Sequence, residues 1–245
     1  MSKATIAVLC GGRGRRLRPD TLKVPKPLVE IEGKPILDYI VEMYIRKGFN
    51  RFILCTGYKS EMIEEHFRQK NLGQCDISFS NSGTDASMLK RIHDTYDKFN
   101  KKIIVTYGDT LTDIDMDQLL MDHDTSLMPA SIVTTKIRSP FGLINYGARG
   151  NIESFDEKPI LHYYIGHTIL NKKAFSHMTD DLLNLPDGDG LVAYFKKMIS
   201  LDLLNGYEHD GFQLTFNTHK GLKEAAEQLK GFYTLSEELS NEDPK

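Results

Sequence analysis

The chain has 245 residues, a formal net charge of −3 and 40% hydrophobic residues, which is typical of one globular domain with a sizeable core. The near-balanced charge argues against a basic surface that grips nucleic acid. No apolar run reaches about 18 residues, so we expect no membrane-spanning helix, and the N-terminus lacks a cleavable signal pattern. We therefore expect a cytoplasmic protein with neither nucleic acid nor membrane as a partner.

The first half of the chain alternates short apolar runs with amphipathic stretches. The runs predict strands at 4–10, 51–57, 76–80 and 101–109. The amphipathic stretches predict helices at 35–48, at 60–69 with Ser60 as N-cap, and at 86–99. This alternation is typical of parallel βαβ units, in which ligands bind at the carboxyl ends of the strands.

The second half of the chain differs from the first. It predicts further strands, some antiparallel, at 126–137, 141–147, 151–157 and 162–171. A helix at 188–199, a hairpin at 203–217 and a final helix at 221–232 follow. We expect a single Rossmann-like α/β domain over 1–235, with a mostly parallel mixed sheet flanked by helices. Its two halves are 1–125 and 126–235, and 236–245 is expected to be a flexible tail.

A loop rich in glycine and arginine follows the first strand. Its glycines, Gly11, Gly12 and Gly14, let the backbone turn sharply and present N–H groups to phosphate oxygens. Four guanidiniums and one lysine between two prolines add positive charge, on Arg13, Arg15, Arg16, Arg18 and Lys26. The spacing fits neither the Walker A pattern nor GxGxxG. The loop predicts a phosphate site, the alternative being a purely structural turn.

Asp109 ends the apolar run VTYGD. A carboxylate at the tip of a buried strand is costly unless a cation or hydrogen bonds compensate for its lost hydration. Mg²⁺ favours one or two carboxylates together with phosphate oxygens and water. Asp109 is therefore the leading candidate for a metal ligand, the alternative being a cap on the following turn. Asp113, Asp115 and Asp117 are expected to cap and lead the next helix.

These motifs resemble those of the sugar-1-phosphate nucleotidyltransferase family. The matching pieces extend over roughly residues 4 to 230 and read LCGGRGRRLRP, VPKPLVEIEGKPIL, VTYGD, FDEKP and GF..TFNT. The pieces LCTGYKSEMIEEHF, VTYGDTLTDIDMDQL and GYEHDGF are most similar to the glucose-1-phosphate cytidylyltransferase branch. The resemblance implies transfer of the nucleoside monophosphate part of an NTP, with CTP as first choice, to a sugar 1-phosphate, with Mg²⁺ as cofactor and pyrophosphate as product.

The resemblance also implies roles for individual residues. Arg16, Lys26 and Asp109 would be catalytic, with Arg16 on the β- and γ-phosphates and Lys26 on the α-phosphate. Nucleotide binding would involve Leu9, Cys10, Gly11, Gly12, Gly14, Arg15, Arg16, Lys26, Ser82, Gly83, Ser87 and Asp109. Acceptor binding would involve Tyr107, Gly142, Glu157, Lys158, Tyr164 and His167. The metal ligands would be Asp109 and Asn217.

The resemblance makes 1–125 the nucleotide-binding half and 126–235 the acceptor-binding half, and the sequence departs from the family pattern mainly in the acceptor-binding half. Asn217 replaces the family's second metal aspartate, and Tyr164–Ile165 replaces its acceptor-binding Asn-Gly pair. A different acceptor, such as a polyol phosphate or a phosphonate, and a different NTP therefore stay open. Three further possibilities also stay open: a homo-oligomer, a catalytically inactive nucleotide-binding protein, and a purely structural role for alternate residues of the strand at 162–171.

Overall fold

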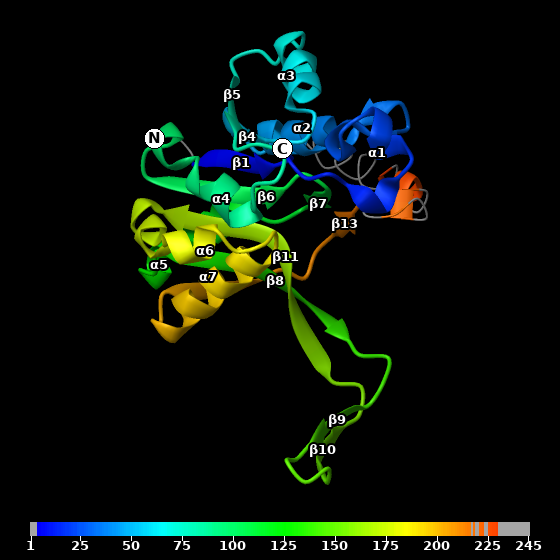
Figure 1. The fold of residues 1–245 in the computed structure, drawn as a ribbon, viewed down its shortest axis with the longest axis vertical. Coiled ribbons are helices and arrows are strands. Elements are labelled where there is room, and N and C mark those ends of the chain that lie inside the picture. Colours follow the sequence, from blue (N-terminus) through cyan, green and yellow to red (C-terminus); the bar gives the residue numbers. More distant parts are fainter. Residues whose placement is uncertain (1–3, 217, 219–220, 223–224, 230–245) are drawn as a thin grey trace, which may run out of the picture.

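The computed structural model describes residues 4–216, 218, 221–222 and 225–229. Its main sheet contains seven strands, β1 (Thr5–Leu9), β4 (Arg51–Thr56), β5 (Asp76–Asn81), β6 (Lys102–Tyr107), β8 (Ala130–Arg138), β11 (Ile160–Asn171) and β12 (Leu204–Glu208). They lie in the order β12-β8-β11-β6-β1-β4-β5 (Figure 1). β11 is antiparallel to both of its neighbours, and the other neighbouring pairs are parallel. The expected Rossmann-like, mostly parallel mixed sheet is confirmed.

Helices cover both faces of this sheet. Strand residues alternate between two cores, so that Ile6 and Val8 belong to one core and Ala7 to the other. The first core packs against α2 (Ile36–Arg46), α3 (Ser60–Arg68) and α5 (Met116–Ser126), and the second against α4 (Met88–His93), α6 (Asp180–Leu183) and α7 (Asp189–Ser200). None of the helices in the described part of the chain is long and apolar enough to cross a membrane.

Short elements complete the structure. Three small antiparallel pairs are formed by β2 (Glu30–Ile31) with β3 (Lys34–Pro35), β7 (Thr110–Thr112) with β13 (Gln213–Thr215), and β9 (Leu143–Tyr146) with β10 (Ile152–Asp156). The remaining helical turns are η1 (Arg15–Leu17), α1 (Asp20–Lys23), η2 (Lys26–Leu28), η3 (Tyr96–Lys98) and η4 (Lys172–His177). Residues 221–222 and 225–229 are helical, and the rest of the expected final helix lies outside the described residues.

Three local expectations are wrong. Ser60 is the first residue of α3 and not its N-cap, and its hydroxyl accepts a hydrogen bond from Asn81 Nδ2 at 2.9 Å. The helix expected over 86–99 ends at His93, where the Thr95 hydroxyl donates to the Ile92 carbonyl and competes with the helical pattern. The segment at 203–217 forms no hairpin, because β12 pairs with β8 and β13 pairs with β7. Asp115 does cap α5, as expected, by accepting from two backbone N–H groups.

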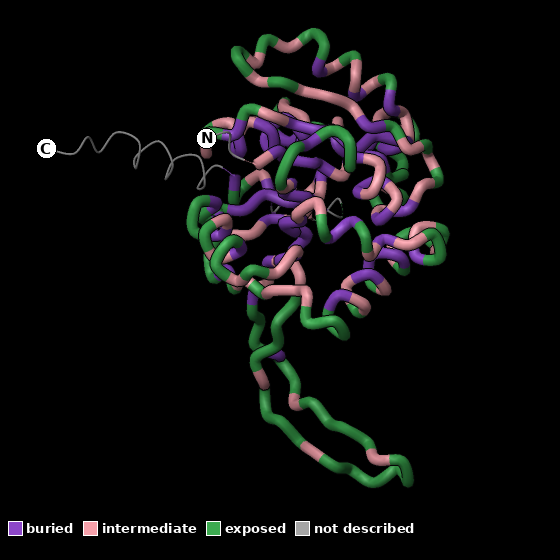
Figure 2. Tube along the Cα trace, turned by 90° about the vertical axis from the view of Figure 1, so that its left-hand side faces the viewer, coloured by how far each residue is buried: buried purple, intermediate pink, exposed green. Residues whose placement is uncertain are grey.

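A long β-arm projects from the body of the molecule. We define the arm as residues 136–163, which comprise the outer ends of β8 and β11 together with β9 and β10 (Figure 1). Nearly all of the arm is exposed, in contrast to the body (Figure 2). Several of its exposed side chains are large and apolar, including Phe141 at 73% and Tyr146 at 71% relative exposure. Soluble proteins rarely leave such a cluster uncovered.

Candidate active site

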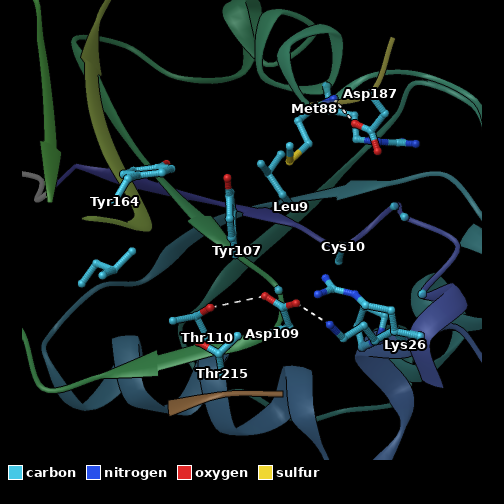
Figure 3. Close-up of a pocket in the computed structure, with 18 of the residues that line it drawn as sticks. Leu9, Cys10, Lys26, Met88, Tyr107, Asp109, Thr110, Tyr164, Asp187 and Thr215 are labelled. Carbon is cyan, nitrogen blue, oxygen red and sulfur yellow. Dashed lines mark hydrogen bonds and ion pairs between the residues drawn. The ribbon is translucent and has the colours of Figure 1, made fainter. Parts of the chain in front are cut away.

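A cavity of about 510 Å³ lies at the carboxyl ends of β1 and β6 (Figure 3). These strands are neighbours in parallel register, with Leu9 opposite Tyr107. The segments that follow them, beginning at Cys10 and Gly108, therefore leave the sheet side by side. The cavity is lined by Leu9, Cys10, Gly11, Gly12, Gly14, Arg16, Lys26, Pro27, Met88, Arg91, Tyr107, Gly108, Asp109, Thr110, Tyr164, Ile165, Asp187, Gln213 and Thr215.

Lys26 and Asp109 form an ion pair in the wall of this cavity. Their side chains are 12% and 20% exposed, respectively. Burial lowers the pKa of Lys26, and the neighbouring Asp109 carboxylate opposes that effect. The Thr110 hydroxyl donates to Asp109 Oδ1 at 3.3 Å, and Phe216 N donates to the Asp109 carbonyl at 2.9 Å. The pair gives the site a cation and an anion with little surrounding water.

The glycines of the loop after β1 are required by close packing. A Cβ on Gly11 would lie 2.3 Å from Arg91 Nη1 and 2.7 Å from the Thr56 carbonyl carbon. Gly14 has a φ of 58°, and a Cβ there would lie 2.7 Å from Lys26 Cβ. Side chains at these two positions would displace the cations that the loop holds. The glycines therefore set both the path of the backbone and the place of the charged groups.

A second cavity of about 440 Å³ adjoins the first along the glycine-rich loop. Its walls come from residues 12–17 and 84–86, and Arg13 Nη2 ties the two segments together by pairing with Asp85 Oδ1 at 2.8 Å. The two cavities share six residues, namely Gly12, Gly14, Arg16, Lys26, Arg91 and Asp187. An anion in this space would lie close to several cationic side chains and to backbone N–H groups of the turns in the loop.

The wall opposite the glycine-rich loop is aromatic. The rings of Tyr107 and Tyr164 meet edge to face, with centroids 5.8 Å apart. Gly166 has a φ of 81°, and a Cβ there would lie 2.5 Å from Tyr107 Cδ2, so the Tyr107 ring packs against the bare backbone of β11. The Tyr164 hydroxyl shares a hydrogen bond of 2.8 Å with the Thr168 hydroxyl. This wall offers ring faces and hydroxyl groups to a small polar molecule.

Ten of the predicted site residues line the first cavity: Leu9, Cys10, Gly11, Gly12, Gly14, Arg16, Lys26, Tyr107, Asp109 and Tyr164. Arg15 lines the second cavity.

The structure does not bring the other predicted residues that it describes to either cavity. Ser82 and Gly83 precede the lining segment 84–86, and Ser87 caps α4 by accepting from Lys90 N. His167 is fully buried in the sheet, where it contacts Thr106 and the Ile165 carbonyl. Gly142, Glu157 and Lys158 lie on the exposed arm. Asn217 lies outside the described residues.

Nine lining residues were not among the predicted site residues: Pro27, Met88, Arg91, Gly108, Thr110, Ile165, Asp187, Gln213 and Thr215. Arg91 is the most informative of them, because it is charged and only 3% exposed. It stands between Leu89 and Ile92, both buried, on a short helix. Arg91 follows Lys90 in an amphipathic stretch, so the local pattern gives no distinctive signal for it, and nothing in the local pattern around Asp187 marks that residue either.

Residues 6–186 match the sequence pattern of the family described as nucleotidyl transferase. The chain belongs to the nucleotidyl transferase family. It is 29% identical to the glucose-1-phosphate cytidylyltransferase of Salmonella typhimurium, over 86% of this chain and 90% of that protein. It is 37% identical to the mannose-1-phosphate guanylyltransferase catalytic subunit beta of Danio rerio, over 62% of this chain and 44% of that protein.

Solved structures give the same fold. HddC from Yersinia pseudotuberculosis, complexed with GMP-PN, superimposes with a TM-score of 0.68 at 20% identity and covers 93% of this chain and 100% of that chain. The predicted relation to sugar-1-phosphate nucleotidyltransferases and the predicted enzyme class are thereby confirmed. The nucleotidyl transferase match ends before Gln213 and Thr215, which line the cavity from β13.

Proposed function

We propose that this nucleotidyl transferase joins the cytidylyl group of CTP to a sugar 1-phosphate and releases pyrophosphate. One observation carries the proposal: Lys26, Asp109, Arg16 and the glycine-rich loop all face one cavity at the carboxyl ends of β1 and β6. A triphosphate needs such a combination of cations and backbone N–H groups. The choice of CTP is supported by the similarity to a glucose-1-phosphate cytidylyltransferase over most of the chain.

The reaction is an in-line attack by a phosphate oxygen of the acceptor on the α-phosphorus of the nucleotide. That oxygen is already anionic, so no protein group needs to remove a proton. Lys26 neutralises the charge that develops on the α-phosphate, and Arg16 binds the departing β- and γ-phosphates. Catalysis then rests on alignment and charge neutralisation. Most of the nucleotide-binding groups in this proposal come from residues 1–125, and β11 and β13 complete the acceptor side.

The donor set at Asp109 fits a magnesium ion. Among the described residues no cluster of three or more histidine, cysteine or acidic side chains is present. A single carboxylate beside a triphosphate suits Mg²⁺, which takes its other ligands from phosphate oxygens and water. The ion supplies further neutralisation of phosphate charge when bound. Asp109 would hold it, and Lys26 would exchange the Asp109 carboxylate for a phosphate oxygen.

The acceptor is proposed to bind against the aromatic wall. Tyr107, Tyr164 and Ile165 line the cavity there, and Gln213 and Thr215 add polar groups from β13. Tyr164–Ile165 stands where the family resemblance placed an Asn-Gly pair, which keeps a polyol phosphate or a phosphonate as the alternative acceptor. His167 is left out of this proposed site, because it is buried behind the wall.

Pyrophosphate release across a matrix of substrates tests the proposal. The matrix combines CTP, UTP, GTP and ATP with a hexose 1-phosphate, a polyol phosphate and a phosphonate, each with Mg²⁺. We expect the highest kcat/KM for CTP with a sugar 1-phosphate. A preference for another combination of nucleotide and acceptor would change the proposed substrates but not the proposed reaction. Absence of pyrophosphate release with every pair, together with nucleotide binding in a thermal-shift assay, would indicate an inactive nucleotide-binding protein instead.

We also propose that the chain self-associates through the arm. The arm carries exposed apolar side chains together with both signs of charge, on Arg138 and Lys158 and on Glu153 and Asp156. A surface of this mixed kind is complementary to a second copy of itself in an antiparallel arrangement.

A further inference from the structure

Arg91 and Asp187 stand where the two cavities meet. Figure 3 places Met88 and Asp187 across the cavity from Asp109 and Lys26, with Leu9 and Cys10 between them. If Lys26 and Asp109 hold the α-phosphate end of the nucleotide, the region of Arg91 and Asp187 is available to the base. The aromatic wall with Tyr164 is then left for the acceptor.

Asp187 is oriented by the start of α4. Its Oδ1 accepts a hydrogen bond from Met88 N at 2.9 Å. No hydrogen bond to Oδ2 is present among the described residues, so that this oxygen is an acceptor at the cavity wall. Asp187 Oδ2 can therefore select a ligand group that carries N–H hydrogens.

Arg91 is fixed on the same short helix, one turn after Met88. Its Nη1 donates to the Thr56 carbonyl at 2.5 Å and its Nη2 donates to the Thr84 carbonyl at 3.3 Å. A guanidinium has five N–H donors, so donors remain beyond these two bonds. The packing of Arg91 against Gly11 and Gly57 holds the guanidinium plane in place at the wall of both cavities. The result is a buried donor close to an exposed carboxylate that one backbone hydrogen bond orients.

We infer that Asp187 and Arg91 read the base of the nucleotide and select cytosine over uracil. The inference rests on the proposed function and names its specificity-determining residues. Cytosine presents an amino group, which donates, next to N3 and O2, which accept. The amino group would donate to Asp187 Oδ2, and N3 and O2 would accept from Arg91. Uracil instead presents O4, an acceptor that would face the carboxylate, and N3–H, a donor that would face the guanidinium.

The decisive variant is Asp187→Asn. The side-chain oxygen of asparagine still accepts from Met88 N, so the local structure is kept, while the second position changes from acceptor to donor. We expect kcat/KM to fall for CTP and to rise for UTP, so that their ratio changes by about ten- to hundredfold. The KM for the acceptor should stay unchanged. Asp189→Asn is the matched control, because Asp189 begins α7 and lines neither cavity.

Two results separate this inference from the proposed function. If the kcat/KM of the wild-type enzyme for UTP equals or exceeds that for CTP, the proposed nucleotide is wrong. If the wild-type enzyme prefers CTP and Asp187→Asn keeps that ratio within about twofold, the reading role of Asp187 is overturned. Asp187→Ala adds a second check, since it should lose preference for CTP without gaining activity on UTP. Thermal shifts with CTP and UTP report the same change without turnover.

Discussion

Lys26 and Asp109 are 83 positions apart in the chain and form one half-buried ion pair. Removing one member of such a pair leaves the other charge in a poorly hydrated site, which costs far more than the loss of a surface pair. In the proposed reaction both members gain new partners, a phosphate oxygen for Lys26 and a cation for Asp109. The resting pair thus holds both groups at the place where the nucleotide needs them.

The substitution Asp109→Asn is expected to lower kcat by at least about a hundredfold, the scale of losing a strong electrostatic stabiliser. Steady-state pyrophosphate release measures the effect. Asp124→Asn serves as control, because it removes an exposed lysine–aspartate pair with Lys102 that is remote from the cavity. Near-normal turnover of Asp109→Asn would remove Asp109 from the mechanism.

His167 predicts a dependence of stability on pH. Burial lowers the pKa of His167 from 6.5 to about 4, and the Ile165 carbonyl, which accepts from Nδ1, opposes that effect. The unfolded chain therefore takes up a proton before the folded protein does. This contribution to stability is complete above pH 6.5 and is lost as pH falls from 6.5 towards 4, by about 3 kcal/mol.

Urea unfolding of the wild type and of His167→Gln at pH 7.5 and pH 5 measures this loss. The difference in unfolding free energy between the two pH values should be smaller in the variant. An equal difference in both proteins would show that His167 does not bind its proton more weakly in the folded state.

At the scale of elements, most strands and helices are predictable from the sequence, because the spacing of apolar residues within one segment is a local property. The glycine-rich loop and Asp109 are predictable for the same reason, since each follows a strand whose end defines the ligand edge. Pairing between distant segments is not local. The sequence 203–217 therefore suggests a hairpin, while β12 and β13 pair with strands far back in the chain.

The same limit applies to the site. Arg91 and Asp187 are brought together by the packing of α4 against α6 and α7, which no local spacing encodes. Lys158 shows the opposite case. Its motif suggests an acceptor contact, but the exposed strands around it carry it onto the arm.

The loop after β1 allows a matched pair of substitutions. Gly11→Ala should lower the unfolding free energy by about 1–3 kcal/mol, because the new methyl group meets Arg91 and the Thr56 backbone. Gly12→Ala should change it by less than about 0.5 kcal/mol, since a Cβ there meets nothing within 4 Å. Chemical denaturation of both variants tests the contrast. Equal stabilities would mean that Arg91 does not pack on the loop.

At the scale of the whole molecule, the arm is the part of the described chain that most needs a partner. Phe141 and Tyr146 are mostly exposed on it, so their replacement removes little packing within one copy of the chain. The double variant Phe141→Ser, Tyr146→Ser is expected to shift the protein towards a monomer. Light scattering after size-exclusion chromatography, over a range of concentrations, measures the change.

Leu127→Ser provides the control for the arm, because Leu127 is 90% exposed and lies outside it. It should leave the mass in solution unchanged. A wild-type protein that is monomeric at every concentration would refute self-association through the arm.

The pairing of β13 with β7 has a consequence for biosynthesis. Leu214 is opposite Leu111, and Gln213 and Thr215 close one wall of the cavity. A chain emerging from the ribosome would thus have the segments that carry Lys26 and Asp109 long before that wall exists. Substrate could not be enclosed until residues 213–215 had been made and had paired with β7, and until then the growing polypeptide would carry an incomplete pocket.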